Sequence, residues 1–414
     1  MKHSLKLIFT VLLIVAIHQV SKSQSIRLAA EWEKQERVHL AWFGNEKRDT
    51  VLCRVIQALQ PDMPITLNIP EDTISVKVKK NLLTYGIDTT LINFNYDPFV
   101  DFWTRDPIFF VFKGTKLIIV CFNYSMYGVY PDILDEQIPD AIKKIGEYDE
   151  RLARKLKLPI IKSDFVFEGG GIETNGDGTF LSIKEMALQR NSTKTITEIE
   201  AELSRTLGAK KIIWLKEGFI EDKTFKNYAP FYKNYFGGGA NMHIDELCRF
   251  VDKRSVILPI IDKKDIHKSP VDSINYYMLE ENYHILQRAV TNEGKKIIIH
   301  RIPMPEVEQL KYTYIIDNKS VSEFKPFGFS TGDTIYRVPA ASYMNYFVSN
   351  KVVLIAKYWK PGMTESQKQK DEDARKLFSK LFPDKKIVQI YTLSINRGGG
   401  GLHCMTHEQP ALKD

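Results

Sequence analysis

Hydrophobic segments recur along almost the whole chain, and their composition is typical of β-strands. Valine, isoleucine, phenylalanine and tyrosine dominate these segments, and such residues favour the pleated, half-buried surface of a sheet. On this basis we predict strands at residues 37–43, 64–69, 107–112, 116–124, 211–215, 255–261, 295–302, 352–359 and 387–391.

Segments with hydrophobic residues at helical spacing lie between these strands. They predict helices near residues 138–156, 193–208, 271–290 and 372–382. Strands and helices alternate from end to end, and no linker rich in proline, glycine or serine divides them. We therefore predict a single α/β domain over residues 24–414, with strand and helix units recurring at uneven intervals.

The first 23 residues differ from this pattern. Lys2 and Lys6 precede an apolar run at 7–17, and small and polar residues follow as far as Ser23. The run is too short to span a bilayer, which needs roughly 20 apolar residues, and this order is typical of a secretory signal. We predict cleavage near Ser23, export to the periplasm or the medium, and no membrane span in the mature chain.

The charge of the chain gives little support for a nucleic-acid partner. The formal net charge is +7, but three of the 58 basic residues lie in the predicted signal, against 51 acidic residues that all lie beyond it. The lysines are scattered in short pairs, without an arginine-rich or aromatic-interleaved stripe. We predict a solvated surface and no binding of nucleic acid.

Four cysteines are present, and their spacing does not predict a zinc site. Cys121 lies in a hydrophobic segment typical of a buried strand, where cysteine is usually a small apolar residue. Whether two of Cys53, Cys121 and Cys248 form a disulfide stays open. Cys404 has no such surroundings.

Polar clusters interrupt or follow the strand-like segments at five places. They are FWTRDP (102–107), VFEGGGIETNGDGTFL (166–181), ANMHIDELCRF (240–250), ASYMNYF (341–347) and GGGGLHC (398–404). Because polar side chains at strand ends often form sites, each cluster is a candidate contributor of catalytic or binding groups.

Each carboxylate in these clusters has both a functional and a structural interpretation. Asp106 lies among apolar residues and needs a partner, which could be Arg105 or a turn. Glu168 precedes glycines that turn the chain away, but their spacing is not that of a phosphate-binding loop. His243 and Asp245 are two residues apart and would face the same way in an extended segment, although such pairs are often surface features.

Cys404 follows four glycines close to the C-terminus, where it is either a presented nucleophile or part of a flexible tail. A thiolate is favoured by a nearby cation or histidine, whereas the carboxylates would raise the pKa of the thiol. This conflict disappears if the substrate is itself a cation that enters the carboxylate pocket. A planar guanidinium fits, because its donors match two carboxylates.

Six segments in order resemble the motifs of the agmatine deiminase and bacterial peptidylarginine deiminase family, within the guanidine-modifying (pentein) superfamily. They are residues 31–43, including Glu31 and Trp32, and 102–107, 167–181, 242–252, 341–347 and 396–410. The resemblance implies a five-bladed α/β-propeller of pseudo-symmetric ββαβ units around a central pocket. It implies no metal and no organic cofactor.

The resemblance also implies a role for each site residue. Cys404 is the nucleophile and His243 the general acid and base, while Asp106 and Asp245 bind the guanidinium and Glu168 orients the histidine or binds substrate. The implied substrate-binding residues are Trp103, Asn345 and Gly401. The thiol attacks the guanidinium carbon, ammonia leaves, and water hydrolyses the thiouronium intermediate to a ureido product.

The substrate stays open between agmatine and peptidyl arginine. Pro107 directly follows Asp106, which shortens a loop of the family pattern, and residues 122–132 lack the arginines with which the peptidylarginine branch binds a C-terminal carboxylate. Glu168 is closer to the agmatine branch, whereas a secretion signal is less expected there. Less favoured hypotheses are a thiol protease and a non-catalytic guanidine-binding protein. Oligomerisation stays open.

Overall fold

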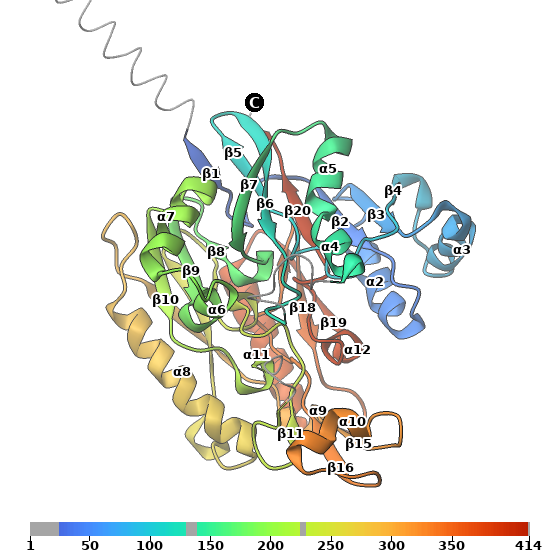
Figure 1. Cartoon of the computed structure of the whole chain (residues 1–414), viewed down its shortest axis with the longest axis vertical. Helices are drawn as coiled ribbons and strands as arrows, with labels where there is room; N and C mark the ends of the chain where they lie inside the picture. Colours follow the sequence, from blue (N-terminus) through green and yellow to red (C-terminus); the bar gives the residue numbers. More distant parts are fainter. Residues whose placement is uncertain (1–24, 130–138, 224–228, 413–414) are drawn as a thin grey trace, which may run out of the picture.

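Small sheets with one recurring pattern of strand pairing make up the computed structural model, which describes residues 25–129, 139–223 and 229–412 (Figure 1). In each of the six sheets formed by these residues, a central strand pairs antiparallel with one neighbour and parallel with the other. Five of these sheets also share a common order of elements along the chain, and their central strands are β2 (Gln35–Ala41), β6 (Lys116–Asn123), β9 (Thr179–Ile183), β13 (Ser255–Ile260) and β18 (Val352–Lys357).

The parallel partner of each central strand follows it in the chain after at least one helix. These partners are β3 (Ile65–Ile69), β7 (Ile160–Val166), β10 (Lys211–Leu215), β14 (Ile298–Pro303) and β19 (Lys386–Tyr391). The connecting helices are α2 (Glu46–Leu59), α4 (Asp140–Gly146) with α5 (Tyr148–Leu156), α6 (Lys184–Arg190) with α7 (Ile196–Leu207), α8 (Pro270–Arg288) and α11 (Glu365–Leu381). Parallel strands require such crossovers, so the helices lie against the sheets.

The antiparallel partner of each central strand is short. Four precede their central strands directly: β5 (Phe110–Lys113), β8 (Glu173–Thr174), β12 (Arg249–Phe250) and β17 (Phe347–Val348). The fifth, β20 (His407–Pro410), comes from the C-terminus and pairs with β2, so that His39 lies opposite His407. Each unit thus has the ββαβ order, and one unit is assembled from both ends of the chain.

Further elements extend this framework. Strands β1 (Ile26–Leu28) and β4 (Ile92–Tyr96) widen two of the sheets, and α3 (Ser75–Thr84) lies between β3 and β4 in the chain. A separate sheet contains β11 (Tyr235–Phe236), β15 (Tyr312–Ile315) and β16 (Thr334–Arg337). The short helices α9 (Val307–Leu310), α10 (Val321–Phe324) and α12 (Leu393–Asn396) complete the helical elements of the described residues.

The nine predicted strands are all present, with bounds that differ by a few residues. The predicted helix near 138–156 is interrupted at Glu147, which separates α4 from α5, and residue 138 lies outside the described residues. Helix α11 begins seven residues earlier than predicted, because the Thr364 side chain accepts a hydrogen bond from the Gln367 backbone N–H and caps it. In α7, Thr195 and Glu198 form a capping box.

All four cysteines are buried and unpaired, which answers the open question about a disulfide. Cys121 lies in β6 as expected, and burial raises the pKa of its thiol. The predicted signal at 1–23 lies outside the described residues. No helix within the described ranges combines the length and apolar composition that a bilayer crossing requires.

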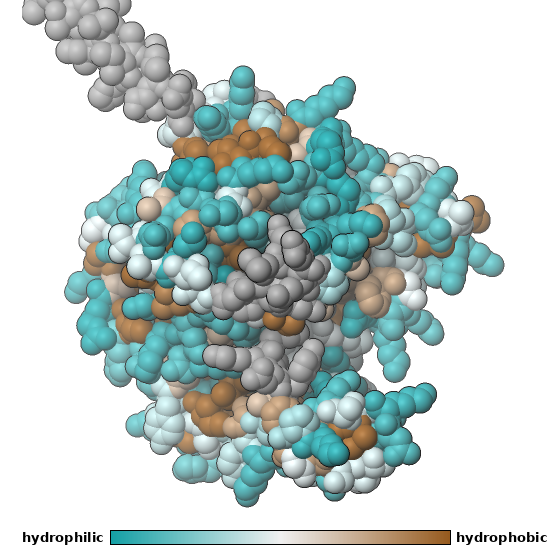
Figure 2. All heavy atoms as spheres, in the orientation of Figure 1, coloured by the Kyte–Doolittle hydropathy of each residue, from teal (hydrophilic) through white to brown (hydrophobic). Residues whose placement is uncertain are grey.

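The visible face of the molecule is mostly hydrophilic, and its hydrophobic residues form separate groups (Figure 2). The largest buried cluster includes residues of β2, β3, α2 and β18, and it also contains Trp103, Leu402 and Cys404. The glycine-rich C-terminal segment is therefore part of the core. The alternative of a flexible tail is wrong, because Leu402 and Met405 supply apolar surface to that core.

Candidate active site

Cys404 lies in the turn that connects α12 to β20, and the glycines before it allow close packing. A methyl group at Gly400 would lie 2.9 Å from the Trp103 ring and 3.1 Å from Cys404 Sγ. One at Gly401 would lie 2.5 Å from Asn345 Oδ1. Side chains at these positions would displace the cysteine or its neighbours, so the local sequence permits this arrangement. Trp103 and Asn345 both border the cysteine, as the sequence predicted.

Asn345 holds the Cys404 turn through both atoms of its amide. Its Oδ1 accepts hydrogen bonds from the backbone N–H groups of His403 (2.8 Å) and Cys404 (3.3 Å). Its Nδ2 donates to Cys404 Sγ (3.0 Å) and to Glu246 Oε1 (2.9 Å). An amide donor beside the sulfur stabilises the thiolate form.

His243 is positioned by a strained loop that the sequence did not reveal. Asn241 and Met242 have φ values of +60° and +72°, which non-glycine residues rarely adopt. Asp222 stabilises this conformation, because its carboxylate accepts hydrogen bonds from the backbone N–H groups of Asn241 (3.2 Å), Met242 (2.7 Å) and His243 (3.2 Å). The buried Asp222 carboxylate thus offsets the strain of the loop, and the loop in turn positions the His243 imidazole.

The segment after His243 is not extended, which is the conformation that the sequence analysis considered for a shared direction of the two side chains. Ile244–Glu246 form a 3-10 turn, which the backbone hydrogen bond from Leu247 N–H to Ile244 O closes (3.0 Å). The turn nevertheless brings Asp245 to the same site as His243, with 4.0 Å between Asp245 Oδ1 and His243 Nδ1. The convergence was predicted correctly and the local geometry was not.

Three carboxylates surround the His243 ring. Asp106 Oδ1 lies 3.7 Å from Nδ1, and Glu168 Oε2 lies 3.7 Å from Nε2. A methyl group at Gly170 would lie 2.5 Å from His243 Nδ1 and 2.8 Å from Asp245 Oδ2, so this glycine lets the groups converge. Burial opposes protonation of His243, but the three carboxylates outweigh it and raise its pKa to about 9.

Asp106 does not pair with Arg105, so that structural alternative is wrong. Asp106 Oδ2 accepts a hydrogen bond from the Tyr127 hydroxyl (3.0 Å), and its Oδ1 accepts one from the Gly170 N–H (3.1 Å). The Arg105 guanidinium instead binds Glu408, at 2.6 Å. Although Pro107 directly follows Asp106 in this loop, the Asp106 carboxylate therefore still lies in the site.

Glu168 is held by an arginine that the sequence did not single out. Arg190 Nε lies 3.1 Å from both Glu168 oxygens, and both side chains are fully buried. Arg190 also donates to the backbone oxygens of Ala240 and Asn241, at 3.1 Å each. The guanidinium therefore links Glu168 to the His243 loop and offsets its buried charge.

Asp245 contacts both Cys404 and a second histidine, His403. Its Oδ2 lies 3.6 Å from Cys404 Sγ and 2.7 Å from His403 Nδ1. Burial raises the pKa of Asp245 to about 7 and that of the Glu246 carboxyl far above its usual range. Burial, together with Asp245, Glu246 and Asp106, raises the pKa of the Cys404 thiol.

The site is therefore a buried cluster of carboxylates around a thiol and an imidazole. Neither ring nitrogen of His243 has a hydrogen-bond partner in the described part of the chain, and neither has Asp245 Oδ1. Asp245 Oδ1 can accept a hydrogen bond, so the carboxylates of the site suit a ligand with several donors and a positive charge. Among the described residues, no group of three histidine, cysteine or acidic side chains is arranged to bind a metal.

The structure brings together every site residue that the sequence predicted. They are Cys404, His243, Asp106, Asp245, Glu168, Trp103, Asn345 and Gly401. Sequence reasoning missed Asp222, Arg190 and Tyr127, because each contacts a site residue that is distant from it in the sequence. His403 carried a signal, because it directly precedes the cysteine in LHC.

Comparisons with known proteins match the chain over nearly its full length. The family model for Porphyromonas-type peptidyl-arginine deiminases matches residues 27–410. The agmatine deiminase of Pseudomonas syringae pv. tomato is 24% identical over 413 residues, which cover 95% of this chain and 98% of the relative.

Solved structures match over a similar extent. The agmatine deiminase of Enterococcus faecalis superposes with a TM-score of 0.72 at 20% identity, covering 95% of this chain and 98% of its own. A C. jejuni agmatine deiminase with substrate bound gives 0.68 at 20% identity, covering 93% and 96%. These proteins have α/β-propeller folds of the pentein class, and the chain shares their α/β fold.

Proposed function

Because this chain belongs to the Porphyromonas-type peptidyl-arginine deiminase family, whose members are hydrolases acting on C–N bonds of guanidines and amidines, we propose that it converts agmatine and water to N-carbamoylputrescine and ammonia. One observation carries the proposal. The Cys404 sulfur and the His243 imidazole lie in one buried cluster with Asp106, Asp245 and Glu168.

The guanidinium would bind between Asp106 and Asp245. Its positive charge offsets the carboxylates that otherwise raise the thiol pKa, so cation binding favours the Cys404 thiolate. Two carboxylates can each accept from the planar donors, which orients the central carbon toward the sulfur.

Chemistry would proceed in two steps around one histidine. The Cys404 sulfur forms a bond to the guanidinium carbon, and His243 in its protonated form donates a proton to the departing nitrogen, which leaves as ammonia. The neutral imidazole then takes a proton from water, whose oxygen attacks the same carbon. The C–S bond breaks and the remaining hydroxyl proton passes to solvent, which releases the ureido product and regenerates the thiolate.

The test is incubation of the purified full-length protein with agmatine, with ammonia and N-carbamoylputrescine measured together. We expect equal amounts of both products. Binding of agmatine without product would instead favour the non-catalytic guanidine-binding hypothesis, and inactivity on agmatine and on arginyl peptides would refute the deiminase proposal.

Peptidyl arginine is the second candidate substrate, and the family model favours it by its description. Against it, residues 122–129 contain no arginine for a C-terminal carboxylate, and Tyr127 contacts Asp106 at this place. Residues 130–132 of that stretch lie outside the described residues. A panel of internal and C-terminal arginyl peptides, with citrulline as the readout, decides between the substrates.

Export and propeller closure complete the proposal. We infer from residues 1–23 that the protein is exported as a single catalytic domain, and cell fractionation with N-terminal sequencing of the mature chain tests this. The five sheets with the ββαβ order favour five blades around one axis. A crystal structure with a bound guanidine would test the closure.

A further inference from the structure

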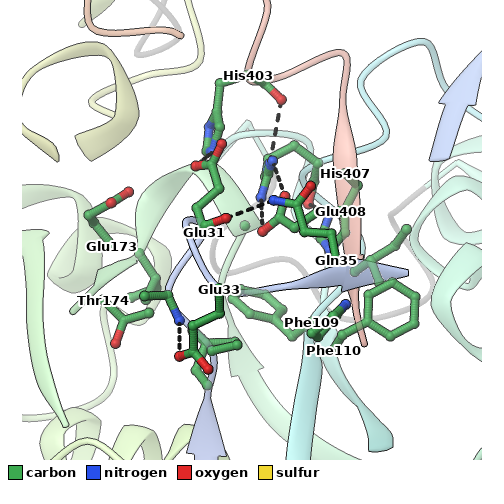
Figure 3. Close-up of a pocket in the computed structure, with 18 residues that line it drawn as sticks. Glu31, Glu33, Gln35, Phe109, Phe110, Glu173, Thr174, His403, His407 and Glu408 are labelled. Carbon is green, nitrogen blue, oxygen red and sulfur yellow. Dashed lines mark hydrogen bonds and ion pairs between the residues drawn. The ribbon is translucent and has the colours of Figure 1, made fainter. Parts of the chain in front are cut away.

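His403 lies between the candidate site and a neighbouring cavity. That cavity offers about 60 Å³ and is lined by polar side chains that include Glu31, Arg105, Glu173 and Glu408 (Figure 3). Figure 3 shows His403 and Glu31 pointing toward each other at one side of it. His403 is buried, so its ring connects the two regions without contact with bulk water.

Both ring nitrogens of His403 contact carboxylate oxygens. Nδ1 lies 2.7 Å from Asp245 Oδ2, and Nε2 lies 3.1 Å from Glu31 Oε2. Each distance is that of a hydrogen bond, and each bond requires one proton between its two heavy atoms. Two protons are therefore shared among three titratable groups.

Glu31 is held in its ionised form. Its Oε1 accepts from the Val348 N–H (2.6 Å), and its Oε2 contacts the Arg249 guanidinium, which is itself paired with Glu173 at 3.1 Å. His403 Nε2 therefore donates to Glu31. The second proton lies in the bond between Asp245 and Nδ1, where either atom can carry it.

The surrounding charges decide where this second proton resides in the empty site. Asp245 and Glu31 contact the ring, while Arg105, Arg249, His407 and His243 are the basic groups around it. Burial and the two arginines lower the pKa of His403, and burial raises that of Asp245 to about 7. Without a ligand, the proton shared in this hydrogen bond therefore lies on Asp245 rather than on His403.

We propose that His403 is a positioning residue that accepts the Asp245 proton when a substrate cation enters the site. The Asp245 O–H bond breaks and a His403 Nδ1–H bond forms, so no proton leaves the protein. The cation meets an ionised Asp245, and Glu31 stabilises the imidazolium on its other side. The proposal rests on the guanidine-binding role of Asp245, and His403 itself does not touch substrate.

Two alkylating probes of equal shape can measure the charge of Asp245 without turnover. Chloroacetamidine is a cation and chloroacetamide is neutral, and with both the Cys404 sulfur displaces chloride from carbon. The thiol pKa of the free protein affects both rates equally, whereas the further gain in binding and in thiolate that the cation produces depends on the carboxylate charge around it. The ratio of the two rates therefore reports the anionic charge that the cation meets. Mass spectrometry of the Cys404 peptide gives each rate, at several pH values between about 6 and 8.

We expect the wild-type ratio to change less than twofold over this range, because the proton moves within the protein. In His403→Asn the new side chain can hydrogen-bond to Asp245 but cannot accept its proton. A group with a pKa near 7 loses most of its charge over this range, so the ratio should fall about tenfold as pH decreases. His403→Gln and Glu31→Gln should change it in the same direction.

His407→Asn is the matched control, since His407 lines the same cavity but contacts the Arg105 backbone oxygen rather than Asp245. Its ratio should follow the wild type. A wild-type ratio that itself falls about tenfold would overturn the proposal, as would a flat ratio in a folded His403→Asn protein. Because the probes need no turnover, inactivity on agmatine would defeat the proposed substrate and leave this result standing.

Discussion

Replacing Gly170 by alanine tests the geometry of the site without removing any functional group. The new methyl carbon would lie 2.5 Å from His243 Nδ1 and 2.8 Å from Asp245 Oδ2. Normal contact is about 3.5 Å or more, so the imidazole must move by about 1 Å. Asp222 fixes the backbone at His243, and the His243 side chain is fully buried, so little space is open to it.

A displacement of this size costs about 100-fold in rate for a positioned catalytic group, or ~2.7 kcal/mol in transition-state stabilisation. We therefore expect kcat/KM for ammonia release from agmatine to fall about 100-fold in Gly170→Ala. The overpacked core should also lose about 1–3 kcal/mol of unfolding free energy, measured by urea denaturation. The Gly170 N–H that donates to Asp106 is retained, so that hydrogen bond is not the cause.

The neighbouring glycine provides a matched control. A methyl group at Gly171 would lie 2.7 Å from Met186 Cε, which is a similar overlap with the end of a flexible side chain. We expect Gly171→Ala to keep kcat/KM within about threefold of wild type, because Met186 can change rotamer. The reasoning fails if Gly170→Ala is as active as wild type, or if both variants lose activity equally.

Other predictions concern the nucleophile, the acid and the loop that holds it. Cys404→Ala should abolish ammonia release while leaving the urea midpoint close to wild type, and substantial turnover would show that another group attacks. His243 stays protonated below its raised pKa of about 9, so kcat/KM should fall above that pH. In Glu168→Gln a carboxylate charge is lost, the pKa of His243 falls, and the alkaline decrease should move to lower pH; an unmoved pH profile would contradict the assigned contact. Asp222→Ala leaves backbone N–H groups unpaired in a strained loop and should cost about 1–3 kcal/mol per orphaned group; a loss below about 0.5 kcal/mol in urea unfolding would contradict this reasoning.

The strands were predictable because their composition alone favours a sheet. Segments such as 116–124 and 352–359 are almost continuously apolar, and no competing pattern obscures them. The two-residue strands β8, β12 and β17 could not be predicted, because each is defined by its partner rather than by its own residues. Helix α2 was missed although the Asn45 side chain caps it and buried residues lie along one face.

The candidate site was predictable where polar residues interrupt apolar segments. Asp106, Glu168 and His243 each carry that signal. Arg190 does not, since an arginine within a polar helix is ordinarily solvated, and only the folded chain pairs it with Glu168. The 3-10 turn after His243 was also hidden, because HID fits an extended strand as well as a turn.

The pairing of β20 with β2 has a consequence for the biosynthesis of the protein. A ribosome makes β2 long before β20, and Cys404 precedes β20 by only three residues. Until this segment has been synthesised, the nascent chain has no nucleophile and one edge of β2 has no strand beside it. A product truncated before Cys404 would be inactive and would keep that uncovered strand edge, which favours association with other chains. Completion of the sheet and acquisition of the chemistry thus depend on the same segment.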